Sequence, residues 1–314
     1  MPDTPQVEEL FGAACGGHRG ALARLLSYVE RGGSPAQQVA TLAHPNAGSA
    51  YTVGLTGAPG AGKSTLTNSL CGVLRGHGDR VGILAIDPSS PFSGGAILGD
   101  RVRMGDQALD EGVIIRSMAT RGHLGGLSLA TPAAIRLLDA VGFPWVLVET
   151  VGVGQVEVEI VGAADTCVVV VNPGWGDAVQ ANKAGLMEIA DIFVVNKADR
   201  AGAANTVQDL EQMLALKHAD GWEPPVVCTV ATEAKGVGEV AEAISRHREW
   251  LEESGEFEQR RQRRATAELR GIIAALLAER ASLLAGSAAF ETALSSVVSR
   301  SQDPWSAAHQ ILGT

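Results

Sequence analysis

Eight residues near the start of the chain have the types and spacing needed to hold a chain of phosphates. They form the stretch Gly57-Ala58-Pro59-Gly60-Ala61-Gly62-Lys63-Ser64, which is followed by Thr65. Its glycines let backbone N–H groups approach an anion, and a helix that starts after them adds partial positive charge. The G-x-x-x-x-G-K-S spacing therefore predicts that Lys63 reaches the β- and γ-phosphates of a nucleotide and that Ser64 binds Mg²⁺.

Three acidic residues could complete a magnesium site. Asp87 comes directly after the apolar run Val81–Ile86, and Asp100 ends a glycine-rich stretch further on. Mg²⁺ prefers oxygen ligands, so both carboxylates are candidates, with an Asx turn at Asp87 and a solvated loop acid at Asp100 as the alternatives. Glu149 precedes Gly152 by three residues, a spacing that resembles the switch segment of GTPases, where the glycine amide senses the γ-phosphate. We expect Glu149 to act on the ion through water.

The quartet Asn196-Lys197-Ala198-Asp199 has the N-K-x-D pattern with which GTPases read guanine. Asp199 can accept hydrogen bonds from the N1–H and the exocyclic amine of guanine, a donor pair that adenine lacks. Asn196 can bond the base edge, and the apolar stem of Lys197 can lie over the ring. After the last apolar run, a backbone amide at Val230 or Ala231 could meet guanine O6.

These residues are positioned by seven apolar runs, rich in Val and Ile, that alternate with helical patterns. Continuous apolar runs of this kind are typical of parallel strands covered on both faces. We expect a doubly wound, mainly parallel α/β sheet, in which ligands bind at the carboxyl ends of the strands. The predicted strands are Val53–Thr56, Val81–Ile86, Val113–Ile115, Trp145–Val148, Cys167–Val171, Ile192–Val195 and Val226–Val230, and the predicted helices include Pro132–Ala140, Ala178–Ile189 and Asn205–Leu216.

Helical patterns flank this core on both sides. The chain is predicted to divide into a helical extension (1–48), a P-loop GTPase domain (49–235) and a second helical extension (236–314). Apolar residues recur at helical spacing within Arg19–Glu30. After a glycine turn, Ser34 is expected to cap a second short helix. The first extension must bury its apolar face against something larger.

Two long helices are predicted after the core, at Val237–Glu253 and Phe257–Leu284. The second carries a stripe of leucines and isoleucines. Such a stripe indicates either packing against a second copy, which we favour, or packing back on the core. A last short helix is expected to begin with Asp303 as its cap and Pro304 in its first position.

The composition argues against several classes of partner and location. With 25 Lys and Arg against 35 Asp and Glu, the formal net charge is −10, which disfavours nucleic acid or an anionic membrane as a partner. The basic run Arg260–Arg264 follows two glutamates and is expected to be a solvated helix face. Four widely spaced cysteines, without a signal peptide, indicate a cytoplasmic protein that lacks disulfides and a zinc site. Cys71 and Cys167 lie within apolar patterns and are expected to be buried.

Two glycine-rich segments stand apart from the strands and helices. The segment Asn172–Lys183 contains Trp175 in a chain poor in aromatic residues. We favour a role for this segment in contacting a partner over a plain connection. The other segment, Arg121–Gly126, contains His123. This histidine lacks a second ligand at metal spacing, so a hydrogen-bonded loop histidine is favoured over a metal ligand.

Taken together, these segments resemble the MeaB/ArgK family of methylmalonyl-CoA mutase-associated GTPases, which are P-loop GTPases of the SIMIBI class. The resemblance covers residues 51–235, and the helical ends are of the expected kind. The matching motifs are the phosphate loop, Asp87-Pro88-Ser89-Ser90, Gly94-Gly95 with Leu98-Gly99-Asp100-Arg101, Arg116-Ser117-Met118-Ala119-Thr120-Arg121-Gly122-His123-Leu124-Gly125-Gly126, Glu149-Thr150-Val151-Gly152-Val153-Gly154-Gln155 and the N-K-x-D quartet.

The resemblance implies a homodimeric, Mg²⁺-dependent hydrolase that converts GTP to GDP and phosphate and binds an adenosylcobalamin-dependent acyl-CoA mutase. Such proteins couple GTP binding and hydrolysis to the loading of intact cofactor and to protection of the mutase. The resemblance also implies that Asn172–Lys183 is a switch loop that contacts the mutase. The metal ligands that it implies are Ser64, Asp87, Asp100 and Glu149, and the catalytic residues are Lys63, Asp100 and Glu149.

Two positions depart from the family pattern. Ser93 stands ahead of the two glycines where a Thr is commoner, and it keeps the hydroxyl. Val230 replaces the usual Ser before Ala231, which weakens the expected contact with guanine O6.

Two other classes of protein share parts of this pattern. A metal-delivery GTPase of the nickel-enzyme type would need a His and Cys cluster near a switch, and the one close pair is Cys15 with His18. A small-molecule kinase would prefer ATP, which the N-K-x-D quartet opposes. Hydrolysis by the protein alone should be slow, because the transition state needs added positive charge. The candidates to supply that charge are Arg101, Arg121 and Lys183.

Overall fold

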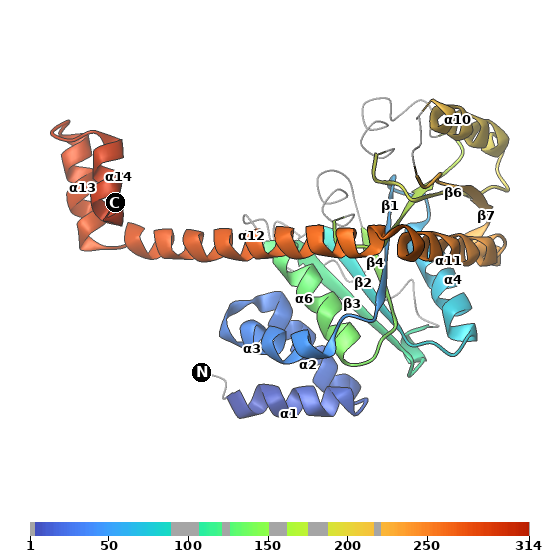
Figure 1. Ribbon diagram of the computed structural model, residues 1–314, viewed down its shortest axis with the longest axis horizontal. Coiled ribbons are helices and arrows are strands. Elements are labelled where there is room, and N and C mark those ends of the chain that lie inside the picture. The colour runs from blue at the N-terminus through green and yellow to red at the C-terminus, as the bar shows by residue number, and fades with distance from the viewer. Residues whose placement is uncertain are drawn as a thin grey trace. The chain divides into compact units, whose positions relative to one another are not determined.

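The computed structural model describes residues 4–88, 107–120, 126–150, 162–174, 188–216 and 221–313 (Figure 1). Its internal contacts divide the chain into two compact units, Met1–Ala265 and Thr266–Thr314. The boundary falls within one long helix, Glu256–Ala285, so the first part of this helix, up to Ala265, belongs to the first unit.

A seven-stranded sheet forms the centre of the first unit, with the strand order β3-β2-β4-β1-β5-β6-β7. All paired strands run parallel, and every strand predicted from the sequence is present. The predicted α/β class is therefore confirmed. The strands are β1 (Tyr51–Gly57), β2 (Val81–Pro88), β3 (Val113–Thr120), β4 (Trp145–Thr150), β5 (Thr166–Val171), β6 (Ile192–Asn196) and β7 (Val226–Thr229).

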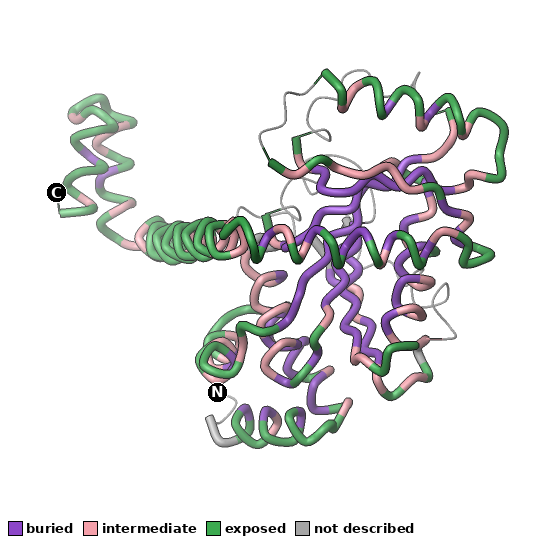
Figure 2. The backbone as a smooth tube through the Cα atoms, turned by 45° about the vertical axis from the view of Figure 1, so that its right-hand side comes forward, coloured by how far each residue is buried: buried purple, intermediate pink, exposed green. Residues whose placement is uncertain are grey.

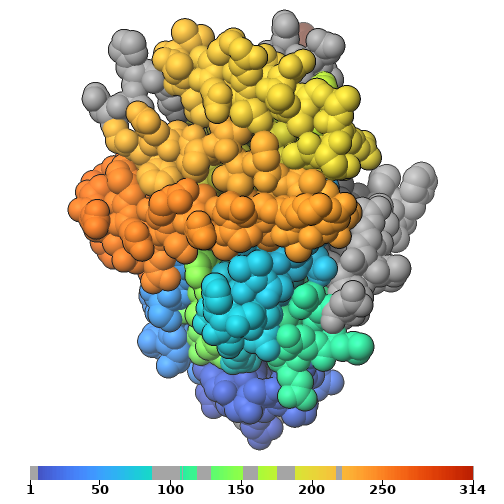
Figure 3. Space-filling model, turned by 90° about the vertical axis from the view of Figure 1, so that its right-hand side faces the viewer, coloured from blue at the N-terminus to red at the C-terminus, as the bar shows by residue number. Residues whose placement is uncertain are grey.

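Helices cover both faces of this sheet, so the central strands β1 and β5 are buried at every position. In β5, Val168 and Val170 pack toward one face and Cys167, Val169 and Val171 toward the other. Helices α4 (Lys63–Gly76) and α11 (Val237–Ser254) cover the first face, and Figure 3 shows α11 lying across that side of the molecule beside α4. Helices α6 (Gly126–Ala140) and α10 (Ala203–Ala215) cover the second face.

The N-terminal helices are α1 (Thr4–Cys15), α2 (Arg19–Arg31) and α3 (Gly33–Ala43). Helices α2 and α3 pack on α6, α1 packs on α2 and α3, and all four share one apolar cluster. The predicted apolar face of α2 is buried, as expected for an extension that cannot fold alone. The sequence did not predict α1. The prediction of Ser34 as a cap was wrong: Gly32 takes the cap position, and α3 begins at Gly33, two residues earlier than predicted.

The long helix α12 (Glu256–Ala285) begins against the core through a cluster of ion pairs. Arg260 bonds Asp191 with both of its terminal nitrogens at 2.9 Å, and Arg264 bonds the carboxylate of Asp165. Arg261 donates to backbone carbonyls of the chain that enters β1. The prediction that Arg260–Arg264 is a solvated face was therefore wrong for three of the arginines. Arg263 is the exposed member.

The second unit contains the rest of α12, α13 (Ala288–Val298) and α14 (Pro304–Leu312). Asp303 caps α14, as predicted, by accepting hydrogen bonds from the amides of Trp305 and Ser306. Figure 2 shows α12 mostly exposed, with half-buried positions mainly toward its start, and no residue of this helix is buried. Within the described residues no single helix could span a membrane, whereas the bent pair α12 and α13 passes by length and composition.

Candidate nucleotide-binding site

The phosphate loop joins β1 to α4, and close packing explains two of its glycines. A Cβ on Gly57 would overlap the carbonyl of Val170 on the neighbouring strand β5. A Cβ on Gly62 would overlap the side-chain nitrogen of Asn196. Both glycines also have φ values in the left-handed region, at 132° and 96°. The loop is therefore held against the ends of β5 and β6.

Lys63 is the first residue of α4 and is buried. Its Nζ donates to the carbonyls of Gly57 and Ala58, at 2.6 and 3.1 Å. The ammonium therefore lies within the curve of its own loop, where the phosphate-binding amides are expected. A bound nucleotide would offer it phosphate oxygens in place of these two carbonyls.

Ser64 links the phosphate loop to the end of β4. Its hydroxyl donates to Oε1 of Glu149 at 2.5 Å, and Glu149 is 1% exposed. Strand pairing explains the contact, because Leu55 of β1 lies opposite Glu149 in the register. A hydroxyl and a carboxylate are oxygen donors that fit Mg²⁺. The arrangement suits the predicted pair, with Ser64 as ligand and Glu149 behind it.

Asn196 is the centre of the base-reading half of the site and is 2% exposed. Its Nδ2 donates to the carbonyl of Ala61 in the phosphate loop at 2.8 Å. Its Oδ1 accepts bonds from the hydroxyl of Thr229 and the amide of Ala231, both at 3.1 Å. The side chain is thus engaged at both ends within the protein and ties the quartet to the phosphate loop. Its Nδ2 carries a second N–H, so the expected contact with the base edge remains a prediction.

Lys197 and Asp199 follow Asn196 at the carboxyl end of β6. The backbone of Lys197 has a φ of 59°, and its Nζ donates to the carbonyl of Gly60 at 2.5 Å. Its stem therefore lies along the phosphate loop, which suits a residue that supports a base. Asp199 is exposed, and its carboxylate accepts no hydrogen bond from the described residues. It is thus available to a ligand.

The loop after β7 closes the site from the other side. The amide of Val230 donates to the carbonyl of Lys235 at 3.0 Å, and the amide of Ala231 donates to Asn196. Both amides that the sequence assigned to guanine O6 are therefore used within the protein. Ser69 of α4 donates to the carbonyl of Ala231 at 2.8 Å. Sequence reasoning missed Ser69 and Thr229, which carry no motif.

Several predicted residues lie outside the described part of the chain. Asp87 is the residue before the last in β2, at the expected edge of the sheet, but its side chain is not described. The residues outside the described ranges are Asp100, Arg101, Arg121, His123, Gly152, Trp175 and Lys183. Their predicted roles remain predictions.

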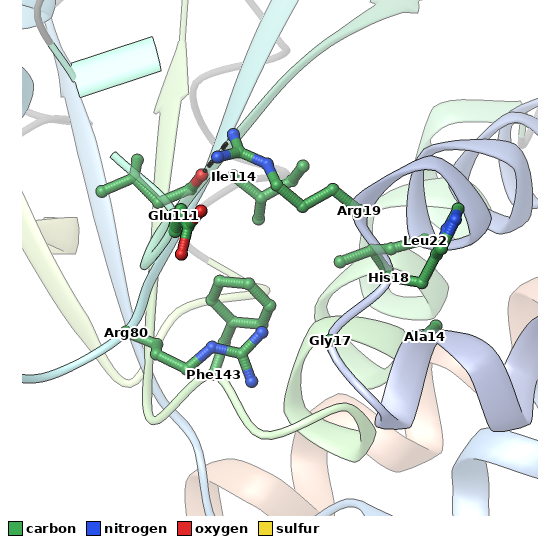
Figure 4. A pocket seen from close by; sticks show the side chains of 10 residues that line it. Ala14, Gly17, His18, Arg19, Leu22, Arg80, Glu111, Ile114 and Phe143 are labelled. Atoms are coloured by element: carbon green, nitrogen blue, oxygen red, sulfur yellow. Dashed lines mark hydrogen bonds between the residues drawn. The ribbon is translucent and has the colours of Figure 1, made fainter. Parts of the chain in front are cut away.

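A separate hollow lies between the N-terminal helices and the amino ends of β2 and β3 (Figure 4). Its guanidinium groups are engaged by the protein. Arg19 donates to the carbonyls of Asp110 and Val113, and Arg80 donates to the carbonyl of Val141 and lies over the ring of Phe143. We interpret the hollow as part of the joint between the helical extension and the sheet.

The parallel sheet, the phosphate loop and the N-K-x-D quartet, tied together through Asn196, define a P-loop GTPase. The chain belongs to the family described as "Methylmalonyl Co-A mutase-associated GTPase MeaB", whose model matches residues 22–284. The resemblance inferred from the sequence is confirmed.

Individual relatives support this assignment. A protein of Pyrococcus horikoshii named "Putative GTPase PH0274" is 50% identical over 310 residues, which cover 98% of this chain and 97% of that protein. The "GTPase ArgK" of Escherichia coli is 38% identical over 264 residues, which cover 81% and 80%. A crystal structure described as "LAO/AO transport system kinase" has a TM-score of 0.73 and 26% identity, covering 100% of this chain and 98% of that one.

Proposed function

We propose that this GTPase is a regulator of an adenosylcobalamin-dependent acyl-CoA mutase, with methylmalonyl-CoA mutase as the first candidate. GTP binding and hydrolysis would be coupled to loading of intact cofactor and to protection of the mutase. The family description, which associates these GTPases with that mutase, supports the partner. A cytoplasmic location belongs to the same proposal.

The observation that carries the proposal is the hydrogen bond between Ser64 and Glu149. Ser64 is the hydroxyl expected to bind Mg²⁺, and Glu149 stands at the end of β4, directly before the predicted switch segment. Binding of nucleotide and Mg²⁺ would exchange this bond for metal coordination. The state of the nucleotide would thereby act on the chain that follows β4, as a switch requires.

The residues of the chain would divide the work on GTP. Asp199 would accept the guanine donors, Lys197 would support the base, and Lys63 would leave its two carbonyls for the phosphates. Mg²⁺, when bound, neutralises charge on the phosphate oxygens. Ser64 and Glu149, with Asp87 and Asp100, are the residues that would hold it.

A homodimer is also proposed, with the second unit as the interface. Large apolar side chains there are exposed, among them Leu277 at 62%, Leu283 at 74% and Trp305 at 79%. A second copy would remove this surface from water. Light scattering should give twice the chain mass of 32.5 kDa, and a monomeric mass at micromolar concentration would refute the dimer.

The experiment that tests the proposed function is GTP hydrolysis by the purified protein, alone and with methylmalonyl-CoA mutase. We expect slow turnover alone and strong stimulation by the mutase, with ATP as the control nucleotide. Stimulation would support the switch and identify the partner. If no adenosylcobalamin-dependent acyl-CoA mutase changes the rate of GTP turnover, the regulatory role is refuted and the GTPase activity remains.

The two alternatives receive less support. Among the described residues no group of three or more His, Cys, Asp or Glu side chains could hold a metal ion. The nitrogen of His18 instead accepts the amide of Ala21 and caps α2. A small-molecule kinase, as in the name of the similar crystal structure, would prefer ATP to GTP. The ATP control in the hydrolysis assay therefore also tests that role.

A further inference from the structure

The nucleotide site contains a hydrogen bond that spans 162 residues of sequence and belongs to no motif. It joins Ser69, on the second turn of α4, to the carbonyl of Ala231 in the loop after β7. We propose that Ser69 is a positioning residue for guanine recognition. It fixes to α4 the loop after β7, whose Ala231 amide holds Asn196, three residues before the Asp199 that is expected to accept the guanine donors. This inference rests on the GTPase assignment and not on the mutase partner.

The bond closes a ring through both halves of the site. Ser69 holds the carbonyl of Ala231 at 2.8 Å, and the amide of the same residue donates to Asn196 at 3.1 Å. Asn196 in turn bonds the carbonyl of Ala61 at 2.8 Å, two residues before α4 begins. The phosphate loop, α4, the loop after β7 and the end of β6 are therefore linked in one circuit.

Burial makes this circuit stiff. Ala231 is 4% exposed and Asn196 is 2% exposed, so neither can exchange its partners for water at low cost. The loop itself is compact, because the amide of Glu233 donates to the carbonyl of Val230 at 2.9 Å. The hydrogen bond from Ser69 attaches this compact loop directly to α4. Without it, the peptide of Ala231 would keep its bond to Asn196 and lose its direct bond to α4.

The ordinary role of a helical serine is different and gives the comparison. Ser245 of α11 bonds the carbonyl of Ala241 one turn earlier, at 3.1 Å, as serines within helices commonly do. Ser69 forgoes that local bond and reaches another segment. Ser245 is exposed and lies on a different helix from the phosphate loop, so it provides a control substitution.

The test compares the affinities for GDP and for inosine diphosphate, which lacks the exocyclic amine of guanine. Calorimetry would be run on the full chain and on Ser69→Ala, Ser69→Thr and Ser245→Ala. We expect Ser69→Ala to weaken GDP binding by about 2- to 12-fold, the range given by one hydrogen bond, and to weaken inosine diphosphate less. The preference for GDP would therefore fall. Ser69→Thr keeps the hydroxyl and should restore that preference, and Ser245→Ala should leave it unchanged.

Two results would overturn the inference. An equal loss of affinity for both nucleotides would make Ser69 a packing residue without a role in reading the base. An unchanged preference in a folded Ser69→Ala protein would do the same. Ser69→Cys, which keeps the size of the side chain with a much weaker donor, repeats the test if the alanine variant unfolds. Failure of the unsubstituted protein to bind GDP would instead refute the GTPase assignment itself.

Discussion

The ion pair between Arg260 and Asp191 is expected to contribute to the stability of the fold, and the loss on breaking it can be calculated approximately. Asp191 is 7% exposed and accepts two bonds of 2.9 Å from the guanidinium of Arg260, whose side chain is 28% exposed. Breaking a buried pair costs about 3–5 kcal/mol, because the remaining charge is left without its partner. Partial exposure of Arg260 reduces this to about 2–4 kcal/mol for Arg260→Met.

Arg263 offers a matched control on the same helix. Its side chain is 68% exposed, and its pairing with Glu256 is long, at 3.7 Å. Exposed pairs of this kind contribute less than about 1 kcal/mol, so Arg263→Met should change stability little. Methionine retains most of the apolar stem in both variants. Urea unfolding followed by tryptophan fluorescence suits the assay, because Trp222 donates to the carbonyl of Asp191 at 2.7 Å.

The effect should also depend on pH. Burial raises the pKa of Asp191, but the bonds from His247 and Arg260 outweigh burial and leave the pKa below its usual value. The ionised carboxylate therefore stabilises the fold fully above about pH 4, the unfolded value, and this contribution is lost as the pH falls through the folded value. The difference in the free energy of unfolding between the unsubstituted protein and Arg260→Met should shrink below about pH 4. Equal losses of stability in Arg260→Met and Arg263→Met, or a difference that does not shrink as the pH falls below about 4, would refute the reasoning.

Three further predictions concern the nucleotide site and the cysteines. Lys63→Ala should abolish GTP turnover in a hydrolysis assay with the fold retained by circular dichroism, and normal turnover would remove the phosphate-loop argument. Asp199→Asn should move the preference from GTP toward xanthosine triphosphate in a competition assay, and an unaltered preference would show that Asp199 does not read the base. Burial raises the pKa of the Cys71 thiol to about 12. A thiol reagent should therefore modify the exposed Cys15 and Cys228 well before the buried Cys71 and Cys167, and equal rates would contradict the burial.

The strands and the helices that cover them were predictable because their patterns are local. Central strands such as β1 and β5 are largely apolar runs buried on both faces, and the helices show their period within a few turns. The phosphate loop and the N-K-x-D quartet were predictable for a related reason, since their chemistry depends on residues that are close in sequence. Strand ends then bring the two motifs together, as the hydrogen bond from Asn196 to Ala61 shows.

The rest depended on contacts between residues far apart in the chain. Arg264 meets Asp165 across 99 residues and Arg260 meets Asp191 across 69, so the sequence showed a basic run without its partners. Asn196 bonds Ala61 across 135 residues and Thr229 across 33, and these contacts became visible only with the positions of their partners. Ser69 shows the same limit, because its spacing matches no motif.

Calorimetry can measure whether nucleotide binding and mutase binding are coupled, as the proposed function requires. The dissociation constant of a non-hydrolysable GTP analogue would be measured with and without saturating methylmalonyl-CoA mutase. We expect the mutase to change the dissociation constant of the analogue by about 5- to 150-fold, the usual range of allosteric coupling. The analogue should change the affinity for the mutase by the same factor. Identical dissociation constants in a complex that does form would contradict the proposed coupling.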